Sequence, residues 1–515
     1  MDGAPTPDAS SPAPASSGPA SARPQRGEEL ELRIESLAFG GEGVARLGDG
    51  GYVVFVAGAI PGDRVRAVVH KRKRSYAHAR TLEVLEPSPE RIAPRARHPG
   101  VPWQVLPYER QLEIKQGQVD EALRRIGHLG GYELQEIVPA LEQWRYRNKL
   151  EYSFGGGEEH GGELVCGFHA SAGGRGVEQI EDCLLASEQG NRVREVALRW
   201  CREQRLSAWD RGFGVGGQDA PEVEASAAAQ VGDRPVGRGR GADARDQRTA
   251  PAPDGRARLR NLVVREGRRT GCFQVRIVST DGELDAGALA GALSAELGAS
   301  LSGVLWTRSR SLAETTAGGE TELVWGEAQL PERLGELDLL ISPEAFFQTN
   351  TEMAEVLYEL AAGCAALEGW ERVYDLYCGI GTIGLTLAPK AGELWGIELV
   401  EEAVADAIAT ARRGGVGNAH FFAGDARLAL PELLARAGRP DVLVVDPPRA
   451  GLSKKVVHRI FDASPKRIVY VSCNPTTLAP NAAELGAAGW RLRSVRPVDM
   501  FPQTHHIESV ALFER

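Results

Sequence analysis

The C-terminal third of the chain alternates short apolar runs with stretches of helical spacing, and this alternation restricts the fold more than any other feature. The apolar runs have the length of single buried strands and lie at 373–376, 394–397, 442–445, 468–471 and 509–513. Strands separated by helices pair in parallel, because the chain crosses over through a helix between them. We therefore predict an α/β domain with a doubly wound parallel sheet over residues 344–515.

A glycine-rich loop follows the first of these strands. Residues 375–384 read DLYCGIGTIG and contain a G-x-G-x-x-G pattern where the strand passes into a helix. Glycines let a ligand approach the backbone, and the start of a helix offers free N–H groups. The next strand ends at Glu398, which is placed to accept hydrogen bonds from ribose hydroxyls. This pair of features predicts an adenosine-containing cofactor and leaves NAD and S-adenosylmethionine both open.

Acidic residues follow two further strands. Asp425 lies in the sequence Gly-Asp-Ala and is placed to bond an adenine edge, while Asp446 opens an Asp-Pro-Pro turn. Asp-Pro-Pro at this edge is frequent in methyltransferases that act on planar nitrogen or carbon centres. Those that methylate exocyclic amines usually have an aromatic residue next, to stack the target base. Here Arg449 takes that position, which argues against methylation of nitrogen.

A cysteine stands at the end of the next strand. The sequence YVSCNP places Cys473 between an apolar run and a strand breaker, at the edge where open α/β sheets bind ligands. A thiol there, downstream of a cofactor loop, indicates covalent catalysis. Taken alone, Cys473 is more easily read as a small buried hydrophobic residue than as a nucleophile. Together with Asp446 and Arg449 it fits addition and elimination at a pyrimidine carbon.

Residues 28–88 are predicted to form a small β-barrel. Alternating strands and glycine turns give about five short strands in this segment. The run HKRKRSY at 70–76 is its most basic element, either a solvated surface or a patch that contacts phosphates. The whole chain carries a net charge of −10, so any binding of nucleic acid must rest on local patches of this kind.

The remaining segments complete the predicted domain organisation. Residues 1–27 are rich in Pro, Ala, Ser and Gly, and we expect a disordered tail. Residues 89–343 are expected to form a central α+β domain with a helix at 108–125 and a basic, aromatic strand at 144–149. A low-complexity insert near 214–255 cannot bury a core, so we expect a disordered surface loop.

The compartment follows from what the sequence lacks. No apolar run reaches the ~18 residues of a membrane span, and residues 1–26 contain no apolar stretch typical of a secretory signal. The 7 cysteines form no C-x-x-C pair, so a disulfide framework is not indicated. We expect a reduced, cytoplasmic protein that has no membrane partner and is a monomer.

Taken together, these motifs resemble the RNA uracil-5-methyltransferase family over nearly the whole chain. Residues 28–86 resemble the TRAM domain, an RNA-binding β-barrel. The sequence WRYRNK at 144–149 matches the signature of the family's central domain, and AFFQTN at 345–350 matches a segment in which Gln348 would touch the cofactor. The end of the chain, DMFPQTHHIE at 499–508, matches the closing motif with its catalytic Glu508.

The resemblance implies a mechanism for named residues. The Cys473 thiolate would attack C6 of a uracil, C5 would then take a methyl group from S-adenosylmethionine, and Glu508 would remove the C5 proton before Cys473 is eliminated. The target base would have to leave its stack. The partner would be RNA, with ribosomal RNA favoured over transfer RNA. The resemblance also implies a set of cofactor contacts: Gln348, Tyr377, Glu398, Asp425 and Asp446.

Two other functions remain open at this point. The glycine loop and Glu398 permit an NAD-dependent oxidoreductase, but that activity leaves Asp446, Cys473 and the barrel unexplained. A non-catalytic RNA-binding protein on the same scaffold has no need of both Cys473 and Glu508. Retention on an adenosylhomocysteine resin rather than an NAD resin separates the first alternative from a methyltransferase.

One departure from the family concerns metal. Many relatives hold an iron–sulfur cluster through three clustered cysteines and a fourth further on. The corresponding segment here, 97–104, reads RHPGVPWQ and has no cysteine, and Cys183 stands at the fourth position. One thiolate cannot hold a four-cysteine cluster. We therefore expect no metal ligands and no iron–sulfur cluster.

Purified protein is expected to be colourless and free of iron, because His98 and Val101 stand where cluster thiolates would be needed. Assays of iron and acid-labile sulfide on protein purified without oxygen check this. A brown preparation with stoichiometric iron and sulfide would contradict it.

Overall fold

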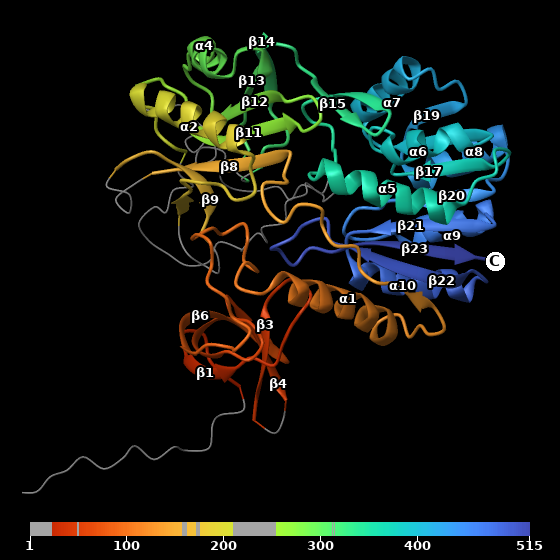
Figure 1. Ribbon diagram of the computed structural model, residues 1–515, viewed down its shortest axis with the longest axis horizontal. Coiled ribbons are helices and arrows are strands. Elements are labelled where there is room, and N and C mark those ends of the chain that lie inside the picture. Colours follow the sequence, from red (N-terminus) through yellow and green to blue (C-terminus); the bar gives the residue numbers. More distant parts are fainter. Residues whose placement is uncertain are drawn as a thin grey trace, which may run out of the picture. The chain divides into compact units, whose positions relative to one another are not determined.

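The computed structural model describes residues 23–48, 51–156, 162–170, 176–209, 254–311, 313 and 315–515 (Figure 1). Most of the predicted tail (1–27) and of the predicted insert (214–255) lies outside these residues. The chain divides into two compact units, Met1–Arg91 and Ile92–Arg515.

The first unit is a curved six-stranded sheet around a small apolar core. Its sheet order is β1-β5-β6-β4-β3-β2. Along β5, Val65, Ala67 and Val69 are buried while the residues between them face outward, as the two-residue period of a strand requires. The sequence predicted about five strands, and the structure adds the two-residue β2. The strands are β1 (Glu29–Arg33), β2 (Ser36–Leu37), β3 (Gly43–Leu47), β4 (Tyr52–Ala57), β5 (Arg64–Arg72) and β6 (Tyr76–Glu86).

The second unit contains a seven-stranded central sheet covered by two helices. Its order is β10-β9-β8-β11-β12-β13-β14, and only β12 and β13 pair in parallel. Helices α2 and α4 contact each other and the sheet, closing a large apolar core (Figure 1). The elements are β8 (Lys149–Gly155), β9 (Val165–His169), β10 (Val177–Gln179), α2 (Glu188–Glu203), β11 (Leu259–Gly267), β12 (Cys272–Ser279), α4 (Ala286–Leu297), η2 (Gly298–Ser300), β13 (Leu301–Arg308) and β14 (Glu320–Gly326).

The predicted strand at 144–149 is wrong except for its last residue. β8 begins only at Lys149, and Arg145 has a φ of 55°, a left-handed conformation that does not continue a strand. The backbone N–H groups of Arg145 and Arg147 donate to the carbonyl oxygens of Leu184 and Leu185 at 2.8 and 3.0 Å. This segment is therefore a bent connection held by tertiary hydrogen bonds, which periodicity alone does not reveal.

An eight-stranded sheet forms the C-terminal part of the second unit. Its order is β19-β18-β17-β20-β21-β23-β22-β7, and β17 to β21 are all parallel. The winding direction reverses beside β17, so right-handed crossovers put α6 and α7 on one face and α8 to α10 on the other, and α5 packs against α6. The strands are β17 (Arg372–Leu376), β18 (Glu393–Glu398), β19 (Ala419–Ala423), β20 (Val442–Val445), β21 (Arg467–Ser472), β22 (Arg491–Val498) and β23 (Glu508–Glu514).

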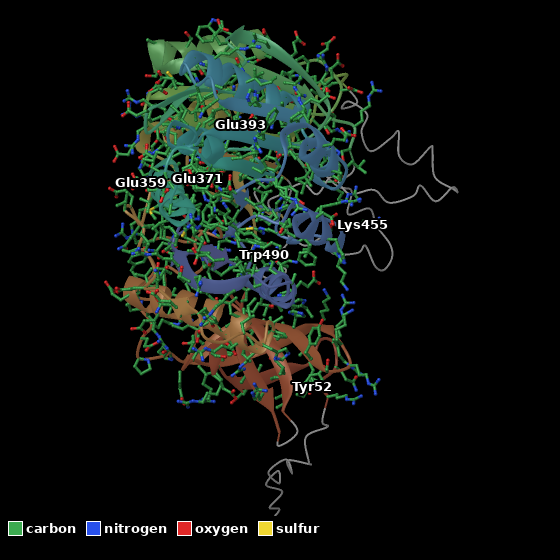
Figure 2. The ribbon with its side chains drawn as sticks, turned by 90° about the vertical axis from the view of Figure 1, so that its right-hand side faces the viewer. Tyr52, Glu359, Glu371, Glu393, Lys455 and Trp490 are labelled. Atoms are coloured by element: carbon green, nitrogen blue, oxygen red, sulfur yellow. The ribbon has the colours of Figure 1, made fainter. Side chains whose placement is uncertain are left out.

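Helices and a hairpin complete this part of the fold. Trp490, labelled in Figure 2, is fully buried just before β22 and donates its indole N–H to the Pro465 carbonyl at 2.9 Å. Among the described helices, none is both long enough and apolar enough to cross a membrane. The remaining elements are α1 (Tyr108–Arg125), β7 (Glu133–Leu134), β15 (Leu330–Leu334), β16 (Leu337–Ile341), α5 (Thr351–Ala365), α6 (Thr382–Leu387), η3 (Ala388–Lys390), α7 (Glu401–Arg413), α8 (Ala426–Ala437), α9 (Lys454–Ala463) and α10 (Pro475–Ala487).

The C-terminal sheet differs from the prediction in two ways. Its last strand, β23, is antiparallel to β21 and β22, because the connection from β22 is too short for the crossover that a parallel strand needs. In addition, β7 pairs with β22, so residues before 344 contribute to this sheet. The expected central domain at 89–343 is therefore not separate from it, and a two-residue strand gives no periodic signal by which to see this.

Candidate active site at the carboxyl edge of the sheet

Five parallel strands end at the same edge of the C-terminal sheet, and a predicted site residue stands at or just beyond each end. Neighbouring strands are in register there, since Leu376 pairs with Ile397 of β18 and with Val445 of β20. The five residues, in strand order from β17 to β21, are Tyr377, Glu398, Asp425, Asp446 and Cys473. The sheet thus brings together side chains that span almost 100 positions of sequence, at the edge where such sheets bind ligands.

The thiol and the candidate base meet through antiparallel pairing. Ser472 of β21 pairs with Ser509 of β23, so the next positions along the two strands are Cys473 and Glu508. Because β23 runs in the opposite direction, its first residue reaches the edge where β21 ends. Cys473 is partly exposed and Glu508 is buried, with 4% of its surface exposed. A thiol open to a ligand therefore stands beside an enclosed carboxyl group.

Burial dominates the electrostatics of this pair. It raises the pKa of Cys473 to about 12, and the charges of Glu508 and Asp446 add to that effect. Burial, then the charge of Asp446, raises the pKa of Glu508 well above its ordinary value. Arg449 opposes both shifts. Burial also raises the pKa of Asp446 to about 7. The edge is thus poorly suited to several negative charges at once. The positive charge of Arg449 favours the ionised form of Cys473 and of Glu508.

Arg449 is held in place by its own backbone and by a histidine. Its carbonyl oxygen accepts hydrogen bonds from Asn474 Nδ2 at 3.0 Å and Thr477 Oγ1 at 3.2 Å. Its Nη2 lies 3.3 Å from Nδ1 of His506, whose pKa is lowered well below the ordinary value by burial and by the charge of His505. A neutral imidazole can accept from the guanidinium. From the sequence, Arg449 served only as an argument against methylation of nitrogen, and its contact with His506 was not predicted.

The glycine loop has the shape of a ligand cradle. Tyr377, Gly379 and Gly381 have φ values of 64°, 54° and 80°, and a Cβ added to Gly379 would meet nothing within 4 Å. Beneath the loop, Asp375 Oδ2 accepts the Gly384 N–H at 3.0 Å while Oδ1 is buried without a partner. Open space over a glycine and an unpartnered buried acceptor fit a ligand that carries hydrogen-bond donors, such as S-adenosylmethionine.

Glu398 and Asp425 are both fixed beside this loop. One oxygen of Glu398 accepts the Gly379 N–H at 3.1 Å and the other accepts the N–H groups of Leu399 and Val400. Asp425 caps α8 and is ion-paired with Arg427, whose hydrogen bond comes first among the causes that lower the pKa of Asp425. The prediction that it bonds adenine stays a prediction.

Exposed apolar side chains follow the same strand ends. Leu399 and Val400 come directly after Glu398 and are 55% and 46% exposed, and Leu428 in the first turn of α8 is 69% exposed. Exposed apolar surface beside a polar cradle is suited to cover a flat ring. These residues were not predicted from the sequence, although apolar residues placed directly after an acidic strand end were a readable signal.

Gln348 lies in a segment that is tied to two other segments by asparagine side chains. Its carbonyl oxygen accepts a hydrogen bond at 2.8 Å from the buried side chain of Asn148. Asn350 caps α5 and also donates to the Met500 carbonyl at 2.9 Å. The three segments 144–149, 345–350 and 499–508 are thus joined by two asparagine side chains. Phe346 beside Gln348 is 66% exposed, and no role was predicted for it.

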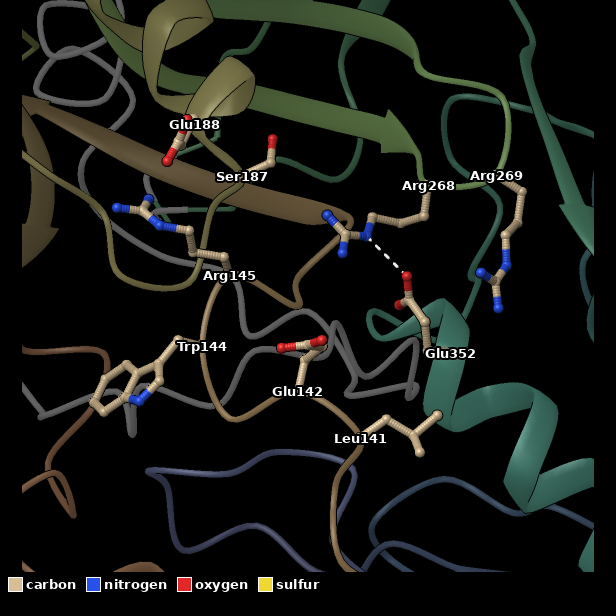
Figure 3. Close-up of a pocket in the computed structure, with 9 residues that line it drawn as sticks. All are labelled: Leu141, Glu142, Trp144, Arg145, Ser187, Glu188, Arg268, Arg269 and Glu352. Atoms are coloured by element: carbon tan, nitrogen blue, oxygen red, sulfur yellow. Dashed lines mark hydrogen bonds and ion pairs between the residues drawn. The ribbon is translucent and has the colours of Figure 1, made fainter.

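A separate pocket of about 510 Å³ lies next to the 144–149 segment (Figure 3). Trp144, Arg145 and Arg268 line it, and Arg268 Nε donates to Glu352 at 3.2 Å. Arg145 is paired with Asp182. None of the seven predicted site residues lines this pocket, and its arginines are neutralised by carboxylates. It therefore offers no groups for the predicted chemistry.

Cys183 has a histidine partner in the buried core of the central sheet. Nε2 of His98 lies 3.4 Å from its sulfur, and burial lowers the pKa of His98 to about 4. Within the described part of the chain, no group of three or more His, Cys, Asp or Glu side chains is arranged to hold a metal ion. The expectation of an iron-free protein stays a prediction.

Comparison with known proteins now bears on this site. Residues 434–515 match the family described as tRNA (Uracil-5-)-methyltransferase, and residues 23–82 match the TRAM domain. The chain is 33% identical over 495 residues to a protein of Halalkalibacterium halodurans described as an uncharacterized RNA methyltransferase, covering 95% of this chain and 97% of that protein. A protein of Chlorobaculum tepidum with the same description is 35% identical, with coverage of 96% and 98%. The chain belongs to the RNA uracil-5-methyltransferase family.

The fold agrees with this assignment. The crystal structure of Pyrococcus abyssi tRNA (uracil-54, C5)-methyltransferase in complex with S-adenosyl-L-homocysteine matches with a TM-score of 0.67 and 25% identity, covering 94% of this chain and 100% of that one. The predicted fold class is confirmed, as is the N-terminal TRAM domain. For this uracil-5-methyltransferase, membership of the family also decides between the two cofactors in favour of S-adenosylmethionine.

Proposed function

We propose that this methyltransferase modifies C5 of a uridine in RNA through a covalent bond between the Cys473 sulfur and C6 of the base. The supporting observation is the register of β21 and β23, in which Ser472 pairs with Ser509, so that Cys473 and the buried Glu508 occupy the next positions of the two strands. A nucleophile and a base side by side at a ligand-binding sheet edge are what this reaction requires.

The proposed steps follow from the chemistry of uracil. C5 is a poor nucleophile until C6 carries an electron-donating adduct, so the sulfur must bond to C6 first. Bound S-adenosylmethionine supplies the methyl group, and Gln348, Tyr377, Glu398, Asp425 and Asp446 are the residues proposed to hold it. The Glu508 carboxylate then takes the proton from C5. The electrons of that C–H bond re-form the C5–C6 double bond, and the C6–S bond breaks with its pair returning to sulfur.

The electrostatics of the site suit this order. Attack needs a thiolate, formed by loss of the thiol proton to solvent, while Glu508 is still protonated. The negative charge passes to the uracil enolate and is cancelled when the enolate takes the methyl group from a cationic sulfonium. Glu508 then gives its own proton to solvent, so that a carboxylate is present to remove the proton at C5. Only one of the two groups is negative at each stage. The charge of Glu508 raises the pKa of Cys473, the charge of Asp446 raises the pKa of both groups, and Arg449 lowers both. A site that tolerates one anion at a time therefore matches a reaction that uses one at a time.

The substrate is proposed to be ribosomal or transfer RNA. A uracil stacked in a duplex cannot reach a thiol that stands beside a buried carboxyl group, so the target uridine lies in a loop or is flipped out of its stack. The matched family and the Pyrococcus abyssi enzyme are both named for transfer RNA. Mapping 5-methyluridine in both RNA classes from a deletion strain identifies the position that loses its methyl group.

Replacement of the two proposed catalytic residues should have different consequences. Cys473→Ala should abolish methyl transfer while folding and adenosylhomocysteine binding persist. Glu508→Gln retains the thiol but lacks the base, so methylation proceeds and elimination stalls. A protein–RNA adduct that survives a denaturing gel should accumulate in Glu508→Gln and be absent from the double variant.

The alternative outcomes are distinct. Methyl transfer by Cys473→Ala would exclude the covalent mechanism. If Glu508→Gln forms no adduct, the base lies elsewhere, and His505 and His506 become the candidates.

The TRAM domain is proposed to bind the RNA backbone through the basic run at the β5–β6 turn. Arg72, Lys73 and Arg74 are exposed, and the turn is held by the hydrogen bond from Tyr52 Oη to the Lys73 carbonyl at 2.9 Å. By contrast, Arg64 and Arg66 on β5 each pair with two glutamates. The exposed cations of the basic run are therefore better placed to contact phosphates than the arginines of β5 that are already paired with glutamates.

Replacing Lys71, Arg72, Lys73 and Arg74 with Gln should weaken RNA binding and flatten its salt dependence, because each lost phosphate contact lowers the slope of log affinity against log salt by about 0.7 to 0.9. Cofactor affinity should not change. The control is Arg66→Gln, which removes a neutralised cation from the same strand. Affinities equal to the parent's at several salt concentrations would show that this turn does not contact RNA.

A further inference from the structure

The connection between β22 and β23, residues 499–507, leads directly to Glu508 and is anchored by a fully buried ion pair. Nζ of Lys115 on α1 lies 2.6 Å from Asp499 Oδ1, and both side chains are 0% exposed. In the hairpin register Val498 pairs with Glu508. Asp499 is therefore the first residue beyond the strand pair that contains the proposed base, and Lys115 holds it from a helix 384 positions away in sequence.

Both carboxylate oxygens of Asp499 are used. Oδ1 accepts from Lys115, and Oδ2 accepts from the hydroxyl of Tyr108 at 2.9 Å. Lys115 also donates to the Phe501 carbonyl at 3.1 Å, two residues further along the connection. Two side chains of α1 therefore fix the start of the connection in position and direction.

A second contact comes from the same face of α1. Gln111 lies one helical turn before Lys115, so the two side chains project together. Its Nε2 donates to Gln503 Oε1 at 2.8 Å, and the Gln503 N–H donates to Gln111 Oε1 at 2.9 Å. Gln503 has a φ of 66°, a conformation that non-glycine residues adopt when their surroundings impose it.

Stability alone does not account for a buried ion pair here. Well-packed apolar side chains of similar volume commonly serve stability as well as a buried pair, because they avoid the desolvation of two charges. What charges add is a defined geometry, with short bonds along fixed directions. The pair stands where a small displacement would move the Glu508 carboxyl relative to the Cys473 sulfur.

We propose that Lys115 and Asp499 are positioning residues for Glu508, holding the β22–β23 connection so that the carboxyl stays aligned for removal of the C5 proton. This inference rests on the covalent mechanism proposed above. It assigns α1, which lies outside both matched family regions, a part in the last step of the reaction. The steps before it, attack and methylation, do not use Glu508 as a base and should be little affected.

The test is the double variant Lys115→Met with Asp499→Asn. It removes both charges together, so that no single charge stays buried without its partner. Other contacts to the connection remain, such as Asn350 to the Met500 carbonyl and Tyr146 to the Pro502 carbonyl, so misplacement rather than unfolding is expected. Single-turnover reactions use RNA from a deletion strain and labelled S-adenosylmethionine. Release of methylated RNA should slow by about 10-fold to 100-fold, while denaturation-resistant adduct accumulates and adenosylhomocysteine affinity stays unchanged.

A matched control lies in the same sheet at its opposite edge. Arg372 and Glu393, the first residues of β17 and β18, form an ion pair at 2.7 Å, and Glu393 is labelled in Figure 2. Arg372→Met with Glu393→Gln should leave the ratio of adduct to released product at the parent's value. If Lys115→Met with Asp499→Asn does not fold, Asp499→Asn alone keeps an oxygen for Lys115 and is measured in the same way.

Two results would overturn the inference. Release at the parent's rate would show that the ion pair does not position the base. Equal loss of adduct and release, or loss of cofactor affinity, would show a general structural role. Glu508→Gln and Cys473→Ala run in parallel separate these results from failure of the mechanism itself. Adduct in Glu508→Gln but not in the ion-pair variant refutes only the positioning role. Absence of adduct from both shows that Glu508 is not the base, whereas methyl transfer by Cys473→Ala refutes the covalent mechanism.

Discussion

β23 lies antiparallel to β21 with Ser509 opposite Ser472, and this pairing sets where the thiol and the buried carboxyl stand. Every other candidate group sits at the end of a parallel strand or in a loop beside it. Glu508 alone comes from the start of a strand, and only the reversed direction of β23 brings it to the same edge. A parallel last strand would put it at the far side of the sheet.

The same edge concentrates buried acids. Burial raises the pKa values of Asp375 and Asp446 to about 8 and about 7, and it also raises the pKa values of Cys473 and Glu508. Such groupings are costly to a fold and are typical of functional sites. Arg449 is the cation that favours ionisation of both Cys473 and Glu508. The arrangement fits the proposed mechanism, in which a thiolate is needed for attack and a carboxylate is needed only later, for removal of the C5 proton.

Much of this sheet could be predicted because parallel strands buried on both faces appear as continuous apolar runs. The predicted runs at 373–376, 442–445 and 468–471 lie within β17, β20 and β21, and α1 has its predicted bounds. Residues placed directly after such runs, among them Asp446 and Cys473, therefore reached the right edge.

Features that depend on tertiary contacts were not accessible in this way. The direction of β23 follows from β22, which the sequence analysis did not identify, and the bend at Arg145 is imposed by contacts to Leu184 and Leu185. The pairing of Lys115 with Asp499 joins residues 384 positions apart, and no motif around either residue predicts that the two are in contact. Glu508 was assigned through its motif, and its place beside Cys473 required the register of two strands.

The most direct test of the account is to trap the parent enzyme on RNA that contains 5-fluorouridine and to sequence the cross-linked peptide by mass spectrometry. Fluorine at C5 cannot leave as a proton does, so the enzyme should remain bonded to the base after methylation. The account predicts a methylated fluorouridine attached to Cys473, in amounts that depend on S-adenosylmethionine. Attachment at another residue, or turnover without any adduct, would contradict it.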